Sequence, residues 1–140
     1  MTAQTTYFGT VYPAECDHMG HLNVAQYVAK FDAASWNFFF NLGVTRDAMD
    51  EQSYALAAVE QKLSYKRELL PGEVIEIRSH ILEVKEKAIR FVHEMIHRQS
   101  GQIAASCEYV TVCLDREKRK ARPYPEAVQR TASGLIAKSE

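Results

Sequence analysis

The sequence carries little net charge, few cysteines and no long uninterrupted hydrophobic run. Its 17 basic and 18 acidic residues give a formal net charge of −1, so composition gives no electrostatic reason to expect binding to nucleic acid or an anionic membrane. The three cysteines form no CxxC pair, which argues against the disulfide framework of a small secreted domain. Lys30, Asp32 and Asn37 interrupt the most apolar stretch, which argues against a membrane-spanning helix.

The N-terminus also lacks a basic segment followed by an apolar one, so the sequence predicts no signal peptide. Without a secretory signal or paired cysteines, we expect a reducing, cytoplasmic location. The sequence has no internal repeat, low-complexity tract or linker. Its 140 residues, 46% of them hydrophobic, are enough to build one buried core. We therefore expect residues 1–140 to form a single domain.

A change in hydrophobic period predicts where a first strand ends and a long helix begins. Residues 5–12 are rich in aromatic and β-branched types and predict a strand, which Pro13 would end. Asn23 is a suitable helix N-cap after the polar loop 14–23, and Gly43 suits the position just after a helix. The face predicted to be buried recurs every three or four residues: Val24, Tyr27, Val28, Phe31, Ser35, Phe38, Phe39 and Leu42. The pattern predicts one helix of about five turns.

The rest of the chain reads mainly as β-structure. After a loop at 44–53, we expect strands at 54–67, 74–84, 88–97 and 103–114, and a short helix at 125–136. Because consecutive strands joined by short turns are antiparallel, these four strands are predicted to form a meander. The fold class is therefore α+β, with an antiparallel sheet that wraps around one long helix.

The long helix carries apolar side chains on its other side as well. These are Ala29, Ala33, Trp36 and Phe40. A helix that is apolar nearly all round is normally buried on more than one side, and one sheet layer covers only one. We therefore expect a homo-oligomer, either a dimer or a tetramer.

Titratable side chains gather in the loop immediately before this helix. Asp17 stands close to the predicted helix start, where amides without intrahelical partners carry partial positive charge. A carboxylate beside such amides can act as a general base or nucleophile on a carbonyl that the amides polarise. Two other roles are open on spacing alone. Asp17 could simply cap the turn, or Cys16, His18 and His21 could join it around a metal ion.

The pattern D-x-x-G-H-x-N-x-x-x-Y runs through this loop into the helix, and its residues are Asp17, Gly20, His21, Asn23 and Tyr27. It resembles the start of the hotdog-fold acyl-CoA thioesterases of the 4-hydroxybenzoyl-CoA thioesterase type. The similarity covers about residues 6–125 and implies a hotdog fold, in which the sheet wraps around one central helix. The strand after the helix does not match the hydroxybenzoyl enzymes, so that substrate is not implied and the acyl group stays open.

The resemblance also implies an activity and residue roles. The family hydrolyses thioesters of coenzyme A, or in some members of acyl carrier protein, with neither metal nor bound cofactor. Asp17 matches the catalytic aspartate, and the Val24 backbone amide matches the group that polarises the thioester carbonyl. His18 matches a pocket or orienting position, and Asn23 shapes the loop or touches the substrate. The substrate-binding residues implied in this region are Gly20, His21 and Tyr27.

A second group of candidates is basic. Five cations lie within residues 116–122, where they could bind phosphate or form an ordinary solvated loop. The resemblance implies that cations in this C-terminal segment and in the hairpin before the last strand hold the nucleotide of coenzyme A. The matching positions are Lys85, Lys87, Lys118 and Lys120.

Two acidic residues interrupt apolar surroundings. Glu60 follows the apolar run 55–59, so it either reaches solvent or faces the substrate, and it is a further candidate for substrate binding. Asp32 lies in the middle of the predicted helix, where it either occupies a surface position or hydrogen bonds to a loop.

Two rival functions stay open beside thioester hydrolysis. A hotdog hydratase or dehydratase would use a histidine with a carboxylate to move a proton at carbon, and His18 and His21 supply histidines. A non-catalytic acyl-CoA binding protein would bind the same ligand without turnover.

Overall fold

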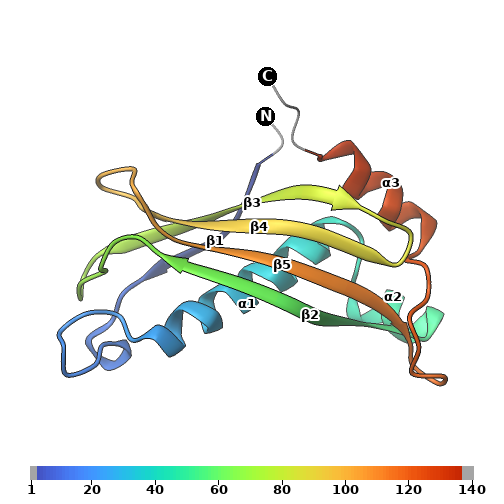
Figure 1. Cartoon of the computed structure of the whole chain (residues 1–140), viewed down its shortest axis with the longest axis horizontal. Helices are drawn as coiled ribbons and strands as arrows, with labels where there is room; N and C mark the ends of the chain where they lie inside the picture. Colours follow the sequence, from blue (N-terminus) through green and yellow to red (C-terminus); the bar gives the residue numbers. More distant parts are fainter. Residues whose placement is uncertain (1–2, 137–140) are drawn as a thin grey trace.

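The computed structural model describes residues 3–136, and the elements among them are arranged as one sheet with helices against it (Figure 1). The strands are β1 (Gln4–Thr10), β2 (Tyr54–Tyr65), β3 (Val74–Val84), β4 (Ala88–His97) and β5 (Ile103–Asp115). The helices are α1 (Val24–Asn41), α2 (Arg46–Gln52) and α3 (Glu126–Gly134), with a 3₁₀ turn η1 (Pro13–Glu15). All predicted strands and both predicted helices are present close to their expected bounds.

The five strands form one antiparallel sheet in the order β1-β3-β4-β5-β2. This confirms the predicted α+β class, but the predicted four-strand meander is wrong for β2, which pairs with β5 at an edge of the sheet. The segment 66–73 between β2 and β3 is not a tight turn. Its Leu69 is buried, and the Leu69 carbonyl accepts the amide of Leu22 at 2.8 Å, so this anchored connection carries the chain past two strands.

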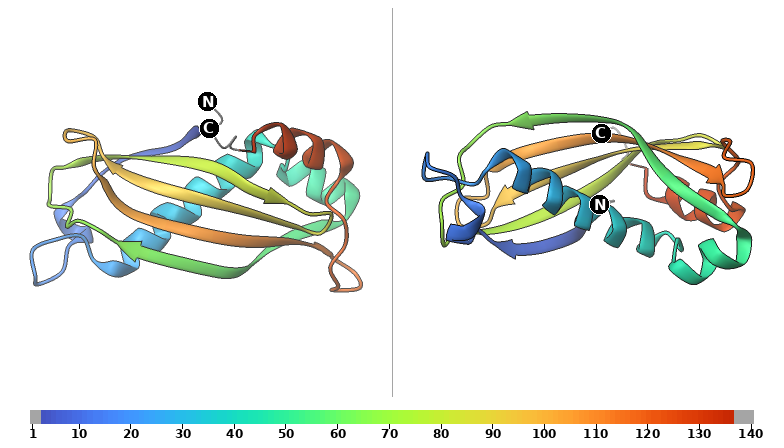
Figure 2. Two further views of the ribbon diagram at one scale, coloured as in Figure 1. Left: turned by 45° about the horizontal axis from the view of Figure 1, so that its top comes forward. Right: turned by 90° about the horizontal axis from the view of Figure 1, so that it is seen from below.

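Helix α1 crosses one face of the sheet, which twists around it (Figure 2). The predicted face is buried: Phe31 and Phe38 are fully covered, and Phe39 packs edge-on against Phe91 of β4 at a ring distance of 5.4 Å. Each such aromatic side chain stabilises the fold by about 1.5–3 kcal/mol on burial. The helix therefore forms the centre of the core, as the period predicted.

The second apolar side of α1 is left uncovered by residues 3–136. Trp36 is 46% exposed and Phe40 is 64% exposed, and Val59 on the neighbouring edge strand β2 is 60% exposed. Trp36 lies beside the edge strand β2, whose outer hydrogen-bonding groups have no strand partner among residues 3–136, whereas Phe40 lies toward β1. The described residues of one protomer thus leave exposed the surface for which the sequence predicted a partner.

A buried histidine lies where α1 meets the sheet. His93 of β4 is fully buried; its Nδ1 lies 2.6 Å from the hydroxyl of Ser79 and its Nε2 lies 2.8 Å from the hydroxyl of Ser35. Its ring also stacks on Phe31. Burial lowers the pKa of His93 to about 3, so the ring is neutral and both nitrogens are satisfied by hydroxyl groups.

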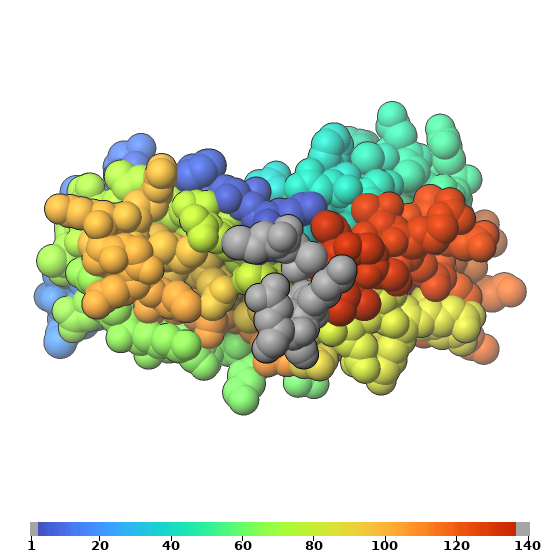
Figure 3. Space-filling model, turned by 90° about the horizontal axis from the view of Figure 1, so that it is seen from above, coloured from blue at the N-terminus to red at the C-terminus, as the bar shows by residue number. Residues whose placement is uncertain are grey.

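The predicted loop at 44–53 is wrong, because it contains α2. Thr45 caps this helix by accepting the amide of Ala48 at 3.0 Å, and Asp47 in the first turn favours the helix dipole. Ser53 ends it in the left-handed conformation. Figure 3 shows α3 lying between this region and the β3–β4 hairpin. None of the helices within residues 3–136 is both long and apolar enough to cross a membrane.

Candidate active site

A tight turn before α1 presents Asp17. The Asp17 amide donates to the His21 carbonyl at 3.2 Å, and the Gly20 amide donates to the Asp17 carbonyl at 2.9 Å. Gly20 has a φ of 84°, a conformation that side chains disfavour, which explains glycine at this position. A β-bridge between Cys16 and Leu22 closes the turn at its base. The carboxylate is therefore carried on a hydrogen-bonded frame.

The carboxylate of Asp17 is held by both oxygens. Its Oδ1 accepts the Met19 amide at 2.9 Å, and its Oδ2 accepts the side-chain amide of Asn23 at 3.2 Å. Asn23 in turn caps α1 through its Oδ1, which accepts the Ala25 amide at 2.9 Å. The turn-capping role left open by the sequence is thus present, and the same bonds fix the carboxylate beside the helix start.

The start of α1 offers an amide that can polarise a ligand. Asn23 takes up the amides of Ala25 and Gln26, whereas the Val24 amide donates to no protein group within the described residues. Helix N-terminal amides of this kind carry partial positive charge and bind anions or developing oxyanions. Asp17 and this amide are therefore linked through a single residue, Asn23.

An ion pair between Lys30 and Glu15 holds the segment that precedes the Asp17 turn against α1. Lys30 of α1 is only 5% exposed, and its Nζ lies 2.9 Å from Oε2 of Glu15. The Glu15 carbonyl also accepts the Asn23 amide at 3.0 Å. Burial alone would raise the pKa of Glu15, but bonds from the Tyr12 amide and from Lys30 hold that pKa below its usual value. Lys30, which looked like an interruption of the apolar helix, thus anchors the segment that carries Asp17.

A hollow of about 300 Å³ lies beside the helix start, and we call it the helix-start hollow. Val24, Tyr27 and His21 line it on one side, with Tyr65 of β2 opposite, and the Tyr27 and Tyr65 rings meet edge-on at 5.1 Å. Burial raises the pKa of Tyr27, which keeps its phenol protonated. Three further lining residues are charged: Lys66, Arg67 and Glu68. His21 and Tyr27 are therefore placed at a cavity, while Asp17 lies just outside its lining.

Two residues predicted to belong to the site, His18 and Glu60, do not line it within one protomer. His18 is exposed at the tip of the turn, next to Met19, which is also exposed. Glu60 is exposed on β2 and does not line the helix-start hollow. A bulge between Ala58 and Glu60 breaks the alternation of the strand, so that Gln61 and not Glu60 lies on the side of the strand that faces α1.

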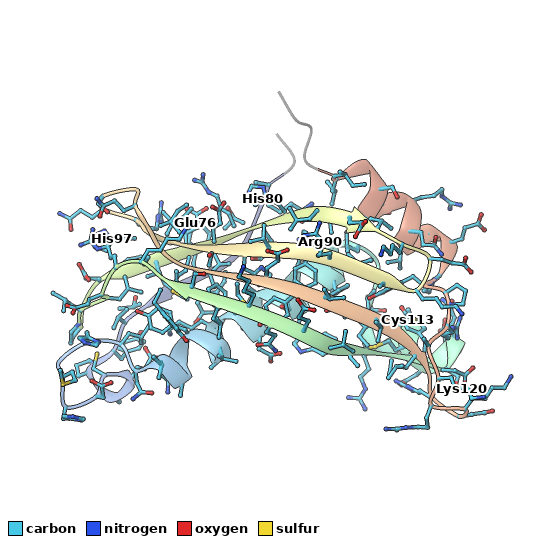
Figure 4. All side chains as sticks on the ribbon, in the orientation of Figure 1. Glu76, His80, Arg90, His97, Cys113 and Lys120 are labelled. Atoms are coloured by element: carbon cyan, nitrogen blue, oxygen red, sulfur yellow. The ribbon has the colours of Figure 1, made fainter. Side chains whose placement is uncertain are left out.

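The basic candidates lie at the far end of the sheet. Figure 4 shows Lys120 at the end opposite His97, and His97 shares its end with the turn that carries Asp17. Lys118 and Lys120 follow β5, which spans 13 residues, or about 40 Å at roughly 3.3 Å per residue. Lys85 and Lys87 lie in the hairpin beside that same end. One chain therefore does not bring these lysines to Asp17.

The sequence reasoning missed a second hollow, of about 100 Å³, between α1 and the strands β2 and β5; we call it the aromatic pocket. Asp32, Trp36 and Phe39 line it from α1, and Tyr109 lines it from β5. The spacing of Asp32, Trp36 and Phe39, four and three residues apart, places them on one side of a helix and could have indicated it.

The alternative of a metal site finds no support in the part of the chain that the structure describes. No group of three or more His, Cys, Asp or Glu side chains within residues 3–136 is placed to hold a metal ion. The three strand histidines each have separate partners: His80 bonds to Glu94, His93 to two serines and His97 to Glu73.

Comparisons with known proteins give a consistent picture. A family model described as the thioesterase-like superfamily matches residues 11–131. Betainyl-CoA thioesterase of Pseudomonas aeruginosa is 26% identical over 120 residues, which are 86% of this chain and 76% of that protein. A Staphylococcus aureus protein solved in complex with CoA has a TM-score of 0.89 at 20% identity, covering 96% of this chain and 85% of that one.

A 1,4-dihydroxy-2-naphthoyl-CoA thioesterase from Synechocystis has a TM-score of 0.83 at 19% identity and covers 95% of this chain and 97% of that one. These structural likenesses confirm the hotdog fold. Resemblance to the 4-hydroxybenzoyl-CoA type in particular stays a prediction.

Proposed function

The chain belongs to the thioesterase-like superfamily of thioester hydrolases, and on that premise we propose that it hydrolyses an acyl-CoA at the turn that carries Asp17. The observation that carries the proposal is the link from Asp17 through Asn23 to the helix start. The Asn23 side chain donates to the carboxylate and caps α1. The next residue is Val24, whose amide has no acceptor among residues 3–136. A carboxylate and an oxyanion donor are thereby held in one rigid unit.

The proposed reaction uses these two groups on opposite parts of the thioester. The Val24 amide donates to the carbonyl oxygen and stabilises the negative charge that develops there, a contribution typically worth about 2.7–4 kcal/mol. In one route, Asp17 removes a proton from a water molecule while the water oxygen bonds to the carbonyl carbon. In the other, the Asp17 carboxylate attacks that carbon and forms an anhydride, which water then hydrolyses. Either way the carbon–sulfur bond breaks, and the CoA thiolate leaves and takes up a proton.

A dimer formed through β2 would complete the substrate site. The strand β2 is an edge strand, and it adjoins the exposed Trp36 of α1. Two copies related by a two-fold axis through β2 would pair antiparallel, so the Tyr65 end of one would lie beside the Tyr54 end of its partner. The mass in solution, measured by sedimentation, should then be an even multiple of 15.9 kDa. A monomer would contradict this arrangement.

Such pairing would bring the basic residues of one protomer close to Asp17 of the other, although they lie far apart within one chain. The Tyr65 end of β2 adjoins the helix-start hollow, and Tyr54 pairs with Asp115, next to the basic segment 116–122. The lysines of one protomer would therefore approach the Asp17 turn of the other. We assign Lys118 and Lys120 to the CoA phosphates, with Lys85 and Lys87 in the neighbouring hairpin as additional contacts. Two other cations of this segment are already engaged, Arg116 with Asp50 and Arg122 with the Gln52 carbonyl.

The experiment compares two thioesters of the same acyl group, one of CoA and one of N-acetylcysteamine, which lacks the nucleotide and its phosphates. Free thiol is followed as it is released. For the double variant Lys118→Gln/Lys120→Gln, we expect KM for the CoA thioester to rise on the order of 10-fold, because two phosphate contacts are lost. The truncated thioester should show no such change.

Arg130→Gln is the matched control, because Arg130 is an exposed cation on α3 outside the assigned set. It should leave both KM values unchanged. An equal rise in KM for both thioesters would overturn the phosphate assignment, and absence of thiol release from every acyl-CoA would overturn the proposed function.

A second candidate function has one observation in its favour. His21 and Glu68 both line the helix-start hollow, and the His21 Nε2 lies 3.8 Å from a Glu68 carboxylate oxygen. A histidine with a carboxylate is the pair that a hydratase acting on enoyl thioesters would use. Loss of the enoyl absorbance of crotonyl-CoA without release of thiol would favour this reaction over hydrolysis.

A further inference from the structure

The aromatic pocket differs in chemistry from the helix-start hollow. It presents the rings of Trp36, Phe39 and Tyr109 together with the carboxylate of Asp32. No lysine, arginine or histidine lines it within residues 3–136. Its volume of about 100 Å³ is well below the roughly 300–1,000 Å³ of a typical ligand pocket, so it suits a small group rather than a long chain or fused rings.

The charge of this pocket has no ion-pair partner among residues 3–136. Asp32 is exposed and makes no hydrogen bond or ion pair with the described residues. Tyr109 stays a neutral phenol: burial raises its pKa, and the nearby Cys107 and Asp32 raise it further. A lone carboxylate beside aromatic faces is the environment that attracts a weakly hydrated organic cation.

We propose that the aromatic pocket binds the acyl end of the substrate and selects a small acyl group that carries a quaternary ammonium. The ammonium methyl groups would pack on Trp36 and Tyr109, whose π faces are negative, and Asp32 would neutralise the charge. This inference deepens the proposed function and rests on it, because the acyl group is taken to be that of the hydrolysed thioester.

The proposed dimer would put this pocket within reach of a short acyl group. Along α1, Asp32 is eight residues from Val24, or about 12 Å at 1.5 Å per residue, too far for a two-carbon acyl group bound at the same helix start. However, Leu56 and Ala58 of β2 also line the pocket, on the half of the strand that would lie beside the partner's helix-start hollow. The groups that act on the substrate carbonyl would then come from one protomer, and the cation pocket would come from the other.

The catalytic test uses two thioesters of equal shape. Trimethylammonioacetyl-CoA and 3,3-dimethylbutanoyl-CoA differ only in whether the branched centre is a positively charged nitrogen or a neutral carbon. We expect kcat/KM to favour the cation by 10-fold or more. Asp32→Asn and Trp36→Leu should each lower this ratio about 10-fold, while Glu51→Gln, an exposed acid on α2, should leave it unchanged.

A binding test does not depend on turnover. Trp36 is the only tryptophan of the chain, so its fluorescence reports on the pocket directly. Titration with tetramethylammonium chloride should change Trp36 emission saturably in the wild type and much more weakly in Asp32→Asn, whereas neutral tert-butanol and sodium chloride should have no saturable effect.

The outcomes separate the two proposals. The cation pocket is contradicted if kcat/KM favours the neutral isostere, or if Asp32→Asn leaves the ratio of the two kcat/KM values unchanged. Neither result would contradict thioester hydrolysis itself. Failure to hydrolyse any acyl-CoA, with saturable tetramethylammonium binding retained, overturns the proposed function and leaves the pocket as a cation site. A wild type that shows neither saturable binding nor a preference for the cation overturns the inference even if the variants fail to fold.

Discussion

The buried His93 predicts a specific loss of stability in mild acid. In the folded chain, burial lowers the pKa of His93 to about 3, whereas an unfolded histidine titrates near about 6.5. As the pH falls below that value, the unfolded chain binds a proton that the folded chain does not. The stability contributed by neutral His93 is therefore complete above about pH 6.5 and is lost progressively as the pH falls toward 3.

The size of the effect follows from the two pKa values. At pH 5 an unfolded histidine is almost fully protonated and His93 in the folded chain is almost fully neutral, so this one group lowers the free energy of unfolding by about 2 kcal/mol relative to pH 7.5. The lowered pKa values of Glu15, Glu73 and Glu76 act in the same direction, but mainly below pH 4.5, so they contribute little between pH 7.5 and 5.

The assay is urea unfolding of the wild type and of His93→Leu at pH 7.5 and at pH 5. The variant should be less stable at pH 7.5, since Ser35 and Ser79 lose their shared partner. Its further loss on going to pH 5 should be about 2 kcal/mol smaller than that of the wild type. An equal loss in both proteins would refute the reasoning, because a group that has been removed cannot contribute to the pH dependence.

Further predictions concern the frame around Asp17. Glu15→Gln should destabilise the fold by about 3 kcal/mol or less, because it leaves Lys30 buried without its partner, and Lys30→Met added to it should restore much of the loss in denaturant unfolding. Asn23→Ala should cost about 1 kcal/mol in the same assay through loss of the helix cap, and should slow thiol release because Asp17 loses a hydrogen bond. Gly20→Ala should cost about 1–2 kcal/mol through its positive φ alone, since a Cβ there meets nothing within 4 Å; Gly20→Asn, which tolerates that conformation better, should cost less.

The sequence was sufficient for the elements whose signals are local. The period of three and four residues predicted α1 and the face it buries, and the Asn23 cap and Gly43 stop predicted its ends. The titratable loop before the helix predicted that Asp17 would lie near the helix start, and Asn23 links the two; the catalytic roles stay predictions. By contrast, α2 was missed, although its cap at Thr45 and first-turn Asp47 are local signals of the same kind.

The remaining features depend on contacts between distant parts of the chain. Pairing of β2 with β5 rather than β3 is set by the anchored segment around Leu69, which strand patterns do not reveal. Lys30 reads as a charge in an apolar helix until Glu15 is seen beside it. The bulge that turns Glu60 outward interrupts an alternation that the sequence alone leaves regular. Tertiary pairing thus decided each feature that local pattern could not.

The central claim is that the Asp17 carboxylate drives thioester hydrolysis, and Asp17→Asn tests it most directly. The variant keeps the size of the side chain and an oxygen that can accept the Met19 amide, but it removes the anionic base. With Asp47→Asn on α2 as control, and with unfolding and acyl-CoA binding measured alongside, thiol release should fall on the order of 10²-fold or more in kcat while binding is retained. A folded Asp17→Asn protein that turns over acyl-CoA at close to the wild-type rate would contradict the account.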